Sequence, residues 1–262
     1  MKKIIFVSII LIIGLLSFKI DSKKKNPPGT NKIEENIFFD ITEVRNVDWR
    51  EFMSWTKENY GKKSKEYLLI IPDTTVWNKK GLEALQEKYL THTTFNDYPV
   101  VGISYEQALG YCKWRSDRVN EAIYIKSNNL NISNNKSNKD YPEIYKYRLP
   151  TKEEWEKIAK LDYSEKTKTQ LKDKNVQRYN LHSDKGEDKM EINITAPVKS
   201  YWPNEKGIYN LIGNVAEMIS EKGKAKGGSW IQNLKDINIE KDFKYEKPTN
   251  WIGFRCICEK IN

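Results

Sequence analysis

The sequence Gly207-Ile-Tyr-Asn-Leu-Ile-Gly-Asn-Val-Ala-Glu217, followed closely by Lys226-Gly-Gly-Ser-Trp230, is the most informative part of this chain. Two glycine-bearing turns enclose a short stretch of polar and apolar residues, in which Asn210, Asn214 and Glu217 supply oxygen atoms. Ca²⁺ takes several side-chain and backbone oxygens from irregular loops of this kind. We therefore expect the loop to bind a hard cation.

Other motifs accompany this loop along the chain. They are Phe39-Asp-Ile-Thr-Glu-Val-Arg-Asn46, Tyr98-Pro-Val-Val-Gly-Ile-Ser-Tyr105 with Tyr111-Cys-Lys-Trp114, Tyr147-Arg-Leu-Pro-Thr-Lys-Glu-Glu-Trp-Glu156, and Ile252-Gly-Phe-Arg-Cys256. With the loop, they resemble the formylglycine-generating-enzyme, or sulfatase-modifying-factor, superfamily, whose motifs occur in the same order. The resemblance covers the chain from about residue 38 to 256. It implies an α+β domain with the sulfatase-modifying-factor fold, which has a C-type-lectin-like core, short strands and a few helices.

Calcium in a structural role is the cofactor that the glycine-rich loop predicts. The expected ligands are the side-chain oxygens of Asn210 and Glu217 and the backbone oxygens of Gly213 and Val215. A second site is expected at Asn180 and the Leu181 carbonyl, with further acids from Asp184, Asp188 or Glu191. The alternative is that Asn214 and Glu217 only brace turns.

The N-terminus has the features of a targeting segment. Two lysines follow Met1, and Ile4 to Phe18 is an unbroken run of fifteen apolar or small residues. This length suits the core of a signal peptide and is short of the roughly 20 residues that span a bilayer. No Ala-x-Ala cleavage site follows, so an uncleaved anchor stays open. We expect a signal peptide or anchor over residues 1–20, a flexible tether over 21–36, and one folded domain over 37–262.

Composition is consistent with a single domain whose packing depends on aromatic residues. Only 38% of residues are hydrophobic, but eight Trp and fifteen Tyr bring large areas that can be buried. The net charge of +9 comes mostly from lysines scattered among 36 acidic residues, and only seven residues are arginine. A nucleic-acid site concentrates its charge and favours arginine, so we expect no nucleic-acid partner. Membrane association is expected only through the N-terminal segment.

Four helices are expected from apolar spacing and capping signals, over residues 48–59, 81–90, 104–119 and 151–160. Ser104 with Gln107 and Thr151 with Glu154 have the spacing of capping boxes. Residues 127–140 are low in complexity and polar, which favours an exposed insertion. Beyond residue 190, short strands and turns are expected.

The three cysteines allow two interpretations. In the resembled family, a cysteine of the Tyr-Cys-x-Trp helix pairs with one that follows Gly-Phe-Arg, which implies a Cys112–Cys256 disulfide here. Export into an oxidising compartment is compatible with such a bond. The alternative is three buried thiols, and Cys258 is expected to be a small buried hydrophobic residue in either case.

Catalytic residues of the resembled superfamily are not found in this sequence. Its copper-dependent oxidase uses two thiols shortly after Gly-Gly-Ser, and these positions correspond to Gln232 and Ile237. Neither supplies the soft thiolate that Cu(I) prefers. Its iron-dependent branch needs three histidine ligands, whereas the chain has only His92 and His182. Fold resemblance alone does not carry an activity, and we therefore expect no catalytic site.

The remaining polar and aromatic candidates have structural interpretations beside functional ones. Arg148 with Glu154 or Glu156, near Arg255, could form an acid–base group, but arginine–carboxylate pairing is the simpler interpretation. An acidic group is more typical of turns and caps than of a metal site; it consists of Asp40, Glu43 and Asp48. Three tryptophans could line a sugar-binding or peptide-binding groove or belong to the core; they are Trp202, Trp230 and Trp251.

The sequence favours a non-catalytic, exported component of the cell envelope with a structural or binding role. The segments over residues 43–52, 72–77, 96–102 and 112–121 look like envelope proteins of Bacteroidetes, including gliding-motility and type IX secretion lipoproteins. No lipidation cysteine follows the apolar run, which is a departure from that group. Envelope proteins or glycans are the expected partners, in the periplasm or cell envelope. The alternatives are a metal-dependent oxidase with other ligands and a carbohydrate-binding module.

Overall fold

The computed structural model describes residues 26–130, 141–172, 178–182 and 194–261. The predicted signal peptide or anchor, most of the predicted insertion, and the candidate acids Asp184, Asp188 and Glu191 lie outside these residues. In the part of the chain that is described, no helix combines the length and apolar character needed to cross a membrane.

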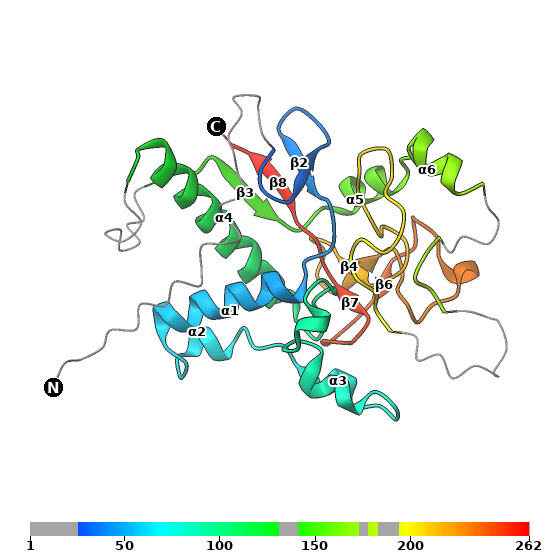
Figure 1. Cartoon of the computed structure of the whole chain (residues 1–262), viewed down its shortest axis with the longest axis horizontal. Coiled ribbons are helices and arrows are strands. Elements are labelled where there is room, and N and C mark those ends of the chain that lie inside the picture. The colour runs from blue at the N-terminus through cyan, green and yellow to red at the C-terminus, as the bar shows by residue number, and fades with distance from the viewer. Residues whose placement is uncertain (1–25, 131–140, 173–177, 183–193, 262) are drawn as a thin grey trace.

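The first sheet joins the two ends of the domain. Its strands are β1 (Thr30–Lys32), β2 (Ile37–Asp40), β8 (Ile257–Lys260) and β3 (Tyr145–Arg148), in the spatial order β1-β2-β8-β3. All neighbours are antiparallel, and β8 lies between β2 and β3 (Figure 1). Because β1 pairs with β2, the sheet includes residues 30–32 of the segment expected as a flexible tether.

Two long helices pack beside this sheet. Helix α1 spans Asn46–Tyr60 and α4 spans Tyr105–Ser127. The predicted Ser104–Gln107 capping box of α4 is confirmed. Helix α4 extends eight residues beyond the predicted end at 119. Asn120 on this extension accepts hydrogen bonds from the backbone N–H of Tyr145, the first residue of β3, at 2.9 Å and from that of the preceding Ile144 at 3.1 Å. The extension is therefore held by tertiary contacts that periodicity cannot show.

Shorter helices complete the outer parts of the molecule. They are α2 (Lys65–Leu68), α3 (Glu83–Lys88), α5 (Lys152–Ala159) and α6 (Glu165–Gln170), with 3₁₀ turns at Thr74–Trp77, Thr93–Phe95 and Leu234–Asp236. Helix α5 begins with the predicted Thr151–Glu154 capping box, which is confirmed. Helix α3 is shorter than the predicted 81–90 because residues 81–82 form a turn before it and residues 89–90 form a turn after it.

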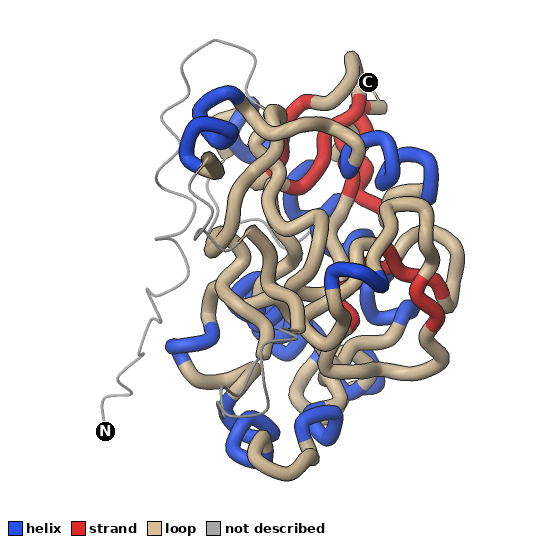
Figure 2. Tube along the Cα trace, turned by 90° about the vertical axis from the view of Figure 1, so that its right-hand side faces the viewer, coloured by secondary structure: helices blue, strands red, loops and turns tan. Residues whose placement is uncertain are grey.

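The second sheet carries the glycine-rich loop. Its strands are β4 (Ala216–Met218), β5 (Lys224–Lys226), β6 (Phe243–Lys244) and β7 (Ile252–Gly253), in the order β6-β5-β4-β7. Loops form much of the molecule (Figure 2). In the loop before β4, Asn210, Gly213 and Asn214 all have positive φ. A Cβ atom at Gly213 would lie 2.6 Å from the Asn180 carbonyl oxygen, so the turn requires glycine there.

Aromatic rings form a large part of the core. Trp49 is stacked on Tyr111 with ring centroids 5.6 Å apart, and Phe254 meets Trp49 edge-on at 6.1 Å. A second group stacks Trp77 against Trp230 at 6.4 Å. Such pairs contribute about 0.5–1.5 kcal/mol beyond the area they bury. The predicted α+β class with short strands, a few helices and aromatic packing is confirmed.

Candidate binding cleft

A buried ion pair lies beneath the glycine-rich loop and ties three elements together. Glu217 on β4 and Arg255, which precedes β8, have exposed fractions of 1% and 0%. Arg255 donates to the Glu217 carboxylate from Nε at 2.7 Å and from Nη2 at 2.5 Å. The indole Nε1 of Trp155 on α5 donates to the same carboxylate at 2.7 Å. Both carboxylate oxygens are therefore engaged, and the pair fixes α5 against the two strands.

This pairing bears on the predicted calcium site. Cation binding at Glu217 would require the carboxylate to leave Arg255, whose positive charge also opposes a second cation nearby. The Asn180 carbonyl, predicted for the second site, accepts the Asn214 backbone N–H at 2.8 Å. In the described part of the chain, no group of three or more His, Cys, Asp or Glu side chains could hold a metal ion. Calcium binding stays a prediction.

Glu43 adds a second carboxylate to this buried network. It is 1% exposed and accepts hydrogen bonds from Nδ2 of Asn214 at 2.8 Å and Nδ2 of Asn210 at 3.3 Å. Arg255 lies 4.0 Å away, at the limit of an ion pair. Burial is the main cause that raises the pKa of Glu43 to about 7, and the neighbouring Glu217 adds to it, whereas Arg255 opposes it. The Arg255 guanidinium thus lies within ion-pair distance of two buried carboxylates.

The other acids predicted as turn and cap residues are engaged in structural contacts. Asp40 pairs with Arg115 at 2.7 Å and accepts the Cys256 N–H at 2.8 Å. Asp48 accepts from Arg45 at the start of α1.

The predicted group of Arg148 with Glu154 or Glu156 also has a structural character. Arg148 forms two hydrogen bonds to Glu154, at 2.7 and 2.8 Å, which confirms the interpretation as a structural pair. Glu156 does not join this pair and instead binds the fully buried Lys226 at 2.7 Å. Asp242 is the second carboxylate on Lys226, at 3.1 Å.

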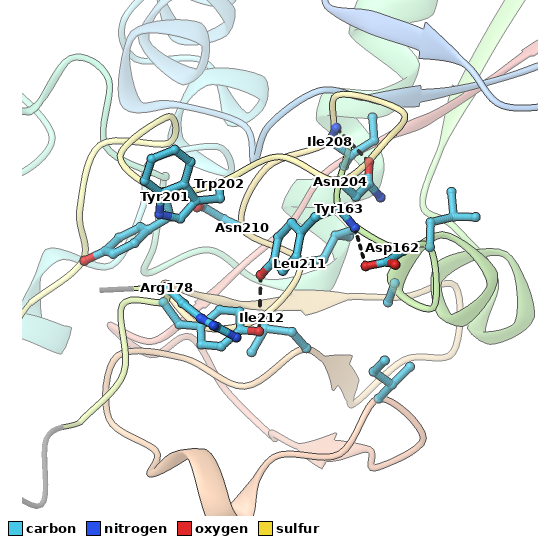
Figure 3. Close-up of a pocket in the computed structure, with 14 residues that line it drawn as sticks. Asp162, Tyr163, Arg178, Tyr201, Trp202, Asn204, Ile208, Asn210, Leu211 and Ile212 are labelled. Carbon is cyan, nitrogen blue, oxygen red and sulfur yellow. Dashed lines mark hydrogen bonds between the residues drawn. The ribbon is translucent and has the colours of Figure 1, made fainter. Parts of the chain in front are cut away.

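A cleft of about 190 Å³ opens beside this network (Figure 3). Four half-buried aromatic side chains lie around it, namely Tyr163, Tyr179, Tyr201 and Trp202. Its apolar surface comes from Ala159, Leu161, Ile208, Leu211, Ile212 and Ile239, and its polar groups from Asp162, Arg178, Asn204 and Asn210. Tyr163 donates to the Tyr179 hydroxyl at 3.2 Å, which orients both rings. The mixture of aromatic surface and few polar groups is typical of a ligand pocket.

Asn210 connects the cleft with the charge network. Its Nδ2 donates to the Val198 carbonyl at 3.0 Å and to Glu43, so the amide nitrogen must face these two acceptors. Its Oδ1 is buried and has no hydrogen-bond partner among the described residues. The left-handed backbone at Asn210, with φ of 53°, places the side chain in this position. Asn210 thus lines the cleft, and its amide oxygen behind the cleft wall is a buried acceptor without a hydrogen bond among the described residues.

The rim of the cleft is positively charged. Arg178 is exposed, and its only hydrogen bond in the described part is a long one from Nη2 to the Leu171 carbonyl at 3.4 Å. Asp162, the one carboxylate among the described residues that line the cleft, is paired at 2.7 Å with Lys168, which also pairs with Glu165 at 2.9 Å. A shallow hollow continues from the cleft; it is lined by Tyr163, Lys168, Leu171, Lys172 and Arg178.

The cysteines predicted to pair are brought together. The sulfurs of Cys112 on α4 and Cys256 lie 3.5 Å apart as buried thiols, without a bond between them. Burial raises the pKa of Cys256 well above its usual value, and burial likewise raises the pKa of Cys258 to about 12. Such thiols are unreactive as nucleophiles. The disulfide stays a prediction, and its two sulfurs are near enough to form it after small side-chain movements.

The positions of the family's copper-binding thiols are filled by groups with other contacts. Gln232 accepts from the Ser229 backbone N–H at 2.7 Å and from its hydroxyl at 2.6 Å. Ile237 packs against Gly228, where an added Cβ atom would meet the isoleucine side chain at 2.6 Å. Gln232 closes the turn after the glycines, and Ile237 contributes to the core.

The two histidines have modest roles. His92 accepts the Thr94 N–H at 3.2 Å and caps a 3₁₀ turn. His182 is exposed, and its backbone N–H donates to the Gln232 carbonyl at 2.9 Å.

The family model of the Sulfatase-modifying factor enzyme 1-like domain matches residues 8–260. The chain belongs to this family. Among solved structures, CarF is similar over 89% of this chain and 96% of its own, with a TM-score of 0.50 and 15% identity. Treponema denticola variable protein 1 is similar over 89% of this chain and 92% of its own, with a TM-score of 0.47 and 17% identity. PvdO from Pseudomonas aeruginosa is similar over 63% of each chain, with a TM-score of 0.39 and 16% identity. The likeness to CarF shows the fold. The search of curated proteins finds no match.

The tryptophans predicted for a groove in this sulfatase-modifying-factor-like domain divide between core and cleft. Trp230 is buried against Trp77, and its Nε1 donates to the Asn250 carbonyl at 3.1 Å. Trp251 packs against the hydrophobic core. Only Trp202 lines the cleft.

Most of the cleft is not predicted by sequence reasoning. Tyr163, Arg178, Tyr179 and Tyr201 are absent from the predicted sites, yet all four line it. Two signals could have indicated them: the adjacent aromatic pair Tyr201-Trp202, and an arginine beside a tyrosine in a chain that has only seven arginines.

Proposed function

We propose that this sulfatase-modifying-factor-like chain is a non-catalytic, exported binding protein of the cell envelope, of the gliding-motility or secretion-associated type. The observation that carries the proposal is that the two positions corresponding to the oxidase's copper-binding thiols hold other side chains. Gln232 is hydrogen-bonded to Ser229, and Ile237 is packed against Gly228, so neither position holds a copper ligand. The cleft beside Asn210 supplies the alternative use of the fold, which is to hold a ligand without changing it.

The three cysteines support the same proposal. Copper-dependent oxidation of a peptide cysteine needs an accessible pair of thiolates. Cys112 and Cys256 lie against one another in the core, and Cys258 is buried with a pKa raised to about 12. The apolar N-terminal run in the sequence supports export, and the resemblance of several segments to envelope proteins supports a location in the cell envelope.

A chemical assay tests the absence of oxidase activity. The full chain is incubated with copper, oxygen and a peptide that carries a cysteine, and the aldehyde product is sought by mass spectrometry. We expect none above a Cys258→Ala control. Installing both family thiols in a Gln232→Cys/Ile237→Cys variant shows whether they alone are lacking. Aldehyde formation by the unaltered chain above that control would show that the protein is an enzyme.

A cell-biological assay tests location and binding. Fractionation should place the chain with the envelope, and affinity capture from envelope extracts should retain protein or glycan partners. Retention should fall for Tyr201→Ala but not for Tyr60→Ala, an exposed tyrosine on α1 that is remote in sequence and outside the cleft. Recovery of the chain only in the cytosolic fraction, or equal retention by both variants, would contradict the proposal.

A further inference from the structure

We propose that the cleft binds an acidic sugar, a ring that carries a carboxylate, as one unit of an acidic polysaccharide. The inference rests on the proposed function as a binding protein and names the ligand class of that site. Three features of the cleft carry it: its aromatic walls, the unpaired acceptor of Asn210, and the basic rim.

The size and walls of the cleft suit one ring. Its volume of about 190 Å³ is below the roughly 300–1,000 Å³ of pockets that hold drug-sized molecules, so a single compact unit fits. Tyrosine and tryptophan offer a flat apolar face together with a polar edge, and they lose little conformational freedom on binding. Tyr163, Tyr179 and Tyr201 add hydroxyl groups around the apolar surface. A sugar has this same combination of apolar ring faces and hydroxyls at its edge.

The amide oxygen of Asn210 favours a ligand that donates a hydrogen bond. Only 5% of the residue is exposed, its Nδ2 is committed to Glu43 and Val198, and its Oδ1 has no partner. A buried acceptor without a hydrogen bond is unfavourable, and a ligand that donates to it gains affinity. A ring hydroxyl donates such a bond, whereas an ionised carboxylate has no proton to give. This acceptor therefore selects the hydroxyl-bearing part of the ligand.

The rim selects the carboxylate. The guanidinium of Arg178 has a single long hydrogen bond, and no carboxylate lies within ion-pair distance of it among the described residues. Arginine binds carboxylates through two parallel hydrogen bonds, which gives direction as well as charge. Lys172 lines the hollow that continues from Tyr163 and Arg178, whereas Lys168 in the same hollow is already paired with Asp162 and Glu165. A second acidic unit would meet positive charge there, as expected for a chain of acidic sugars.

A peptide fits these features less well. Extended peptides are commonly recognised by the edge of a strand, which supplies backbone hydrogen bonds. No residue of β1 to β8 is among those that line the cleft. The polar groups of the cleft are side-chain hydroxyls, two amides, the Arg178 guanidinium and the Asp162 carboxylate, whose charge is matched by Lys168. The hydroxyls, amides and guanidinium match a hydroxylated ring.

Isothermal titration of the full chain with a galacturonic-acid trisaccharide tests the proposal. Its fully methyl-esterified form is the matched control, because it keeps the rings and hydroxyls and loses the charge. We expect the acid to bind and the ester to bind at least about ten-fold more weakly, since a charged hydrogen bond is worth a factor of that order. Binding of the acid should weaken as salt is raised, because the rim is exposed.

Variants assign the binding to the cleft. Arg178→Gln should weaken binding of the acid about ten-fold or more while leaving binding of the ester unchanged. Tyr201→Ala should weaken binding of both the acid and the ester. Lys63→Gln, a charge loss on the exposed turn between α1 and α2, should change neither. Circular dichroism checks that each variant folds, and Tyr201→Phe replaces Tyr201→Ala if the latter does not.

The outcomes are decisive in either direction. Equal affinity for acid and ester, no binding of the acid, or binding unaffected by Arg178→Gln and the Tyr201 variant would each overturn the proposal. So would a peptide with a free carboxyl terminus that binds in the cleft while the trisaccharide does not. That last result leaves the proposed binding function standing, since only the ligand class would have failed.

Discussion

Replacing Glu43 by glutamine should make the stability of the protein less dependent on pH. The glutamate is fully buried between the two asparagines of the glycine-rich loop, and Arg255, its nearest positive charge, is already paired with Glu217. Burial therefore disfavours the ionised form and raises the pKa from 4.5 to about 7. A glutamine side chain has nearly the same shape and cannot ionise.

The direction of the effect follows from proton linkage. The folded protein binds this proton more tightly than the unfolded chain, because the folded pKa of Glu43 is the higher one. The resulting stabilisation is fully present below a pH of about 4.5 and is lost as the pH rises through about 7. A rise in pKa from 4.5 to about 7 corresponds to a free energy on the order of 3 kcal/mol, of which about 2–3 kcal/mol falls between about pH 5 and pH 8.

Urea unfolding of the wild type and Glu43→Gln, at several values between about pH 5 and pH 8, measures this contribution. The variant has its own constant offset, because the amide hydrogen-bonds differently to Asn210 and Asn214. The informative quantity is the change in the difference between the two proteins. The variant should gain about 2–3 kcal/mol relative to wild type as the pH rises over this range. A difference that stays constant with pH would refute the reasoning, and so would a gain as the pH falls.

Two further predictions concern the core. In protein exported under oxidising conditions, peptide mapping should find a Cys112–Cys256 disulfide and a free Cys258, and loss of the bond in Cys112→Ala should cost about 2–5 kcal/mol of stability; three alkylated thiols in the wild type would exclude the bond. Arg255→Met should destabilise the fold by about 3–5 kcal/mol because it leaves Glu217 buried and unpaired. Adding Glu217→Gln to that variant should restore part of the loss in chemical denaturation, whereas purely additive losses would show that the two side chains are not coupled.

Local signals in the sequence were sufficient for parts of the fold. The capping boxes at Ser104 and Thr151 predict where α4 and α5 begin, because each cap is formed by residues within one turn. The end of α4 was not predictable, since its last turns depend on Asn120 and β3, which are distant in sequence. β1 was missed because three polar residues, Thr30–Lys32, gain their strand conformation only by pairing with β2.

The candidate site was less predictable than the fold. Glu217 was identified from its loop, but its partner Arg255 lies 38 residues later in the chain, and only the structure joins them. The cleft combines side chains from residues 159–163, 178–179, 201–212 and 239. No spacing rule relates such segments. Aromatic residues also carry the same signal whether they pack in the core, as Trp230 does, or face a ligand, as Trp202 is proposed to do.

The position of β8 between β2 and β3 sets the order in which this protein can fold. Residues 257–260 are synthesised after both β2 and β3, yet these two strands have no hydrogen-bonded contact with each other without them. Pairing across such a separation must overcome a large loop-closure entropy, so it is slow. A chain still being made therefore carries two unpaired strand edges, which favour association with other chains. If the chain crossed a membrane before β8 paired, it would still be incompletely folded and able to pass through. Pairing of β8 with β2 and β3 would then complete the fold on the far side.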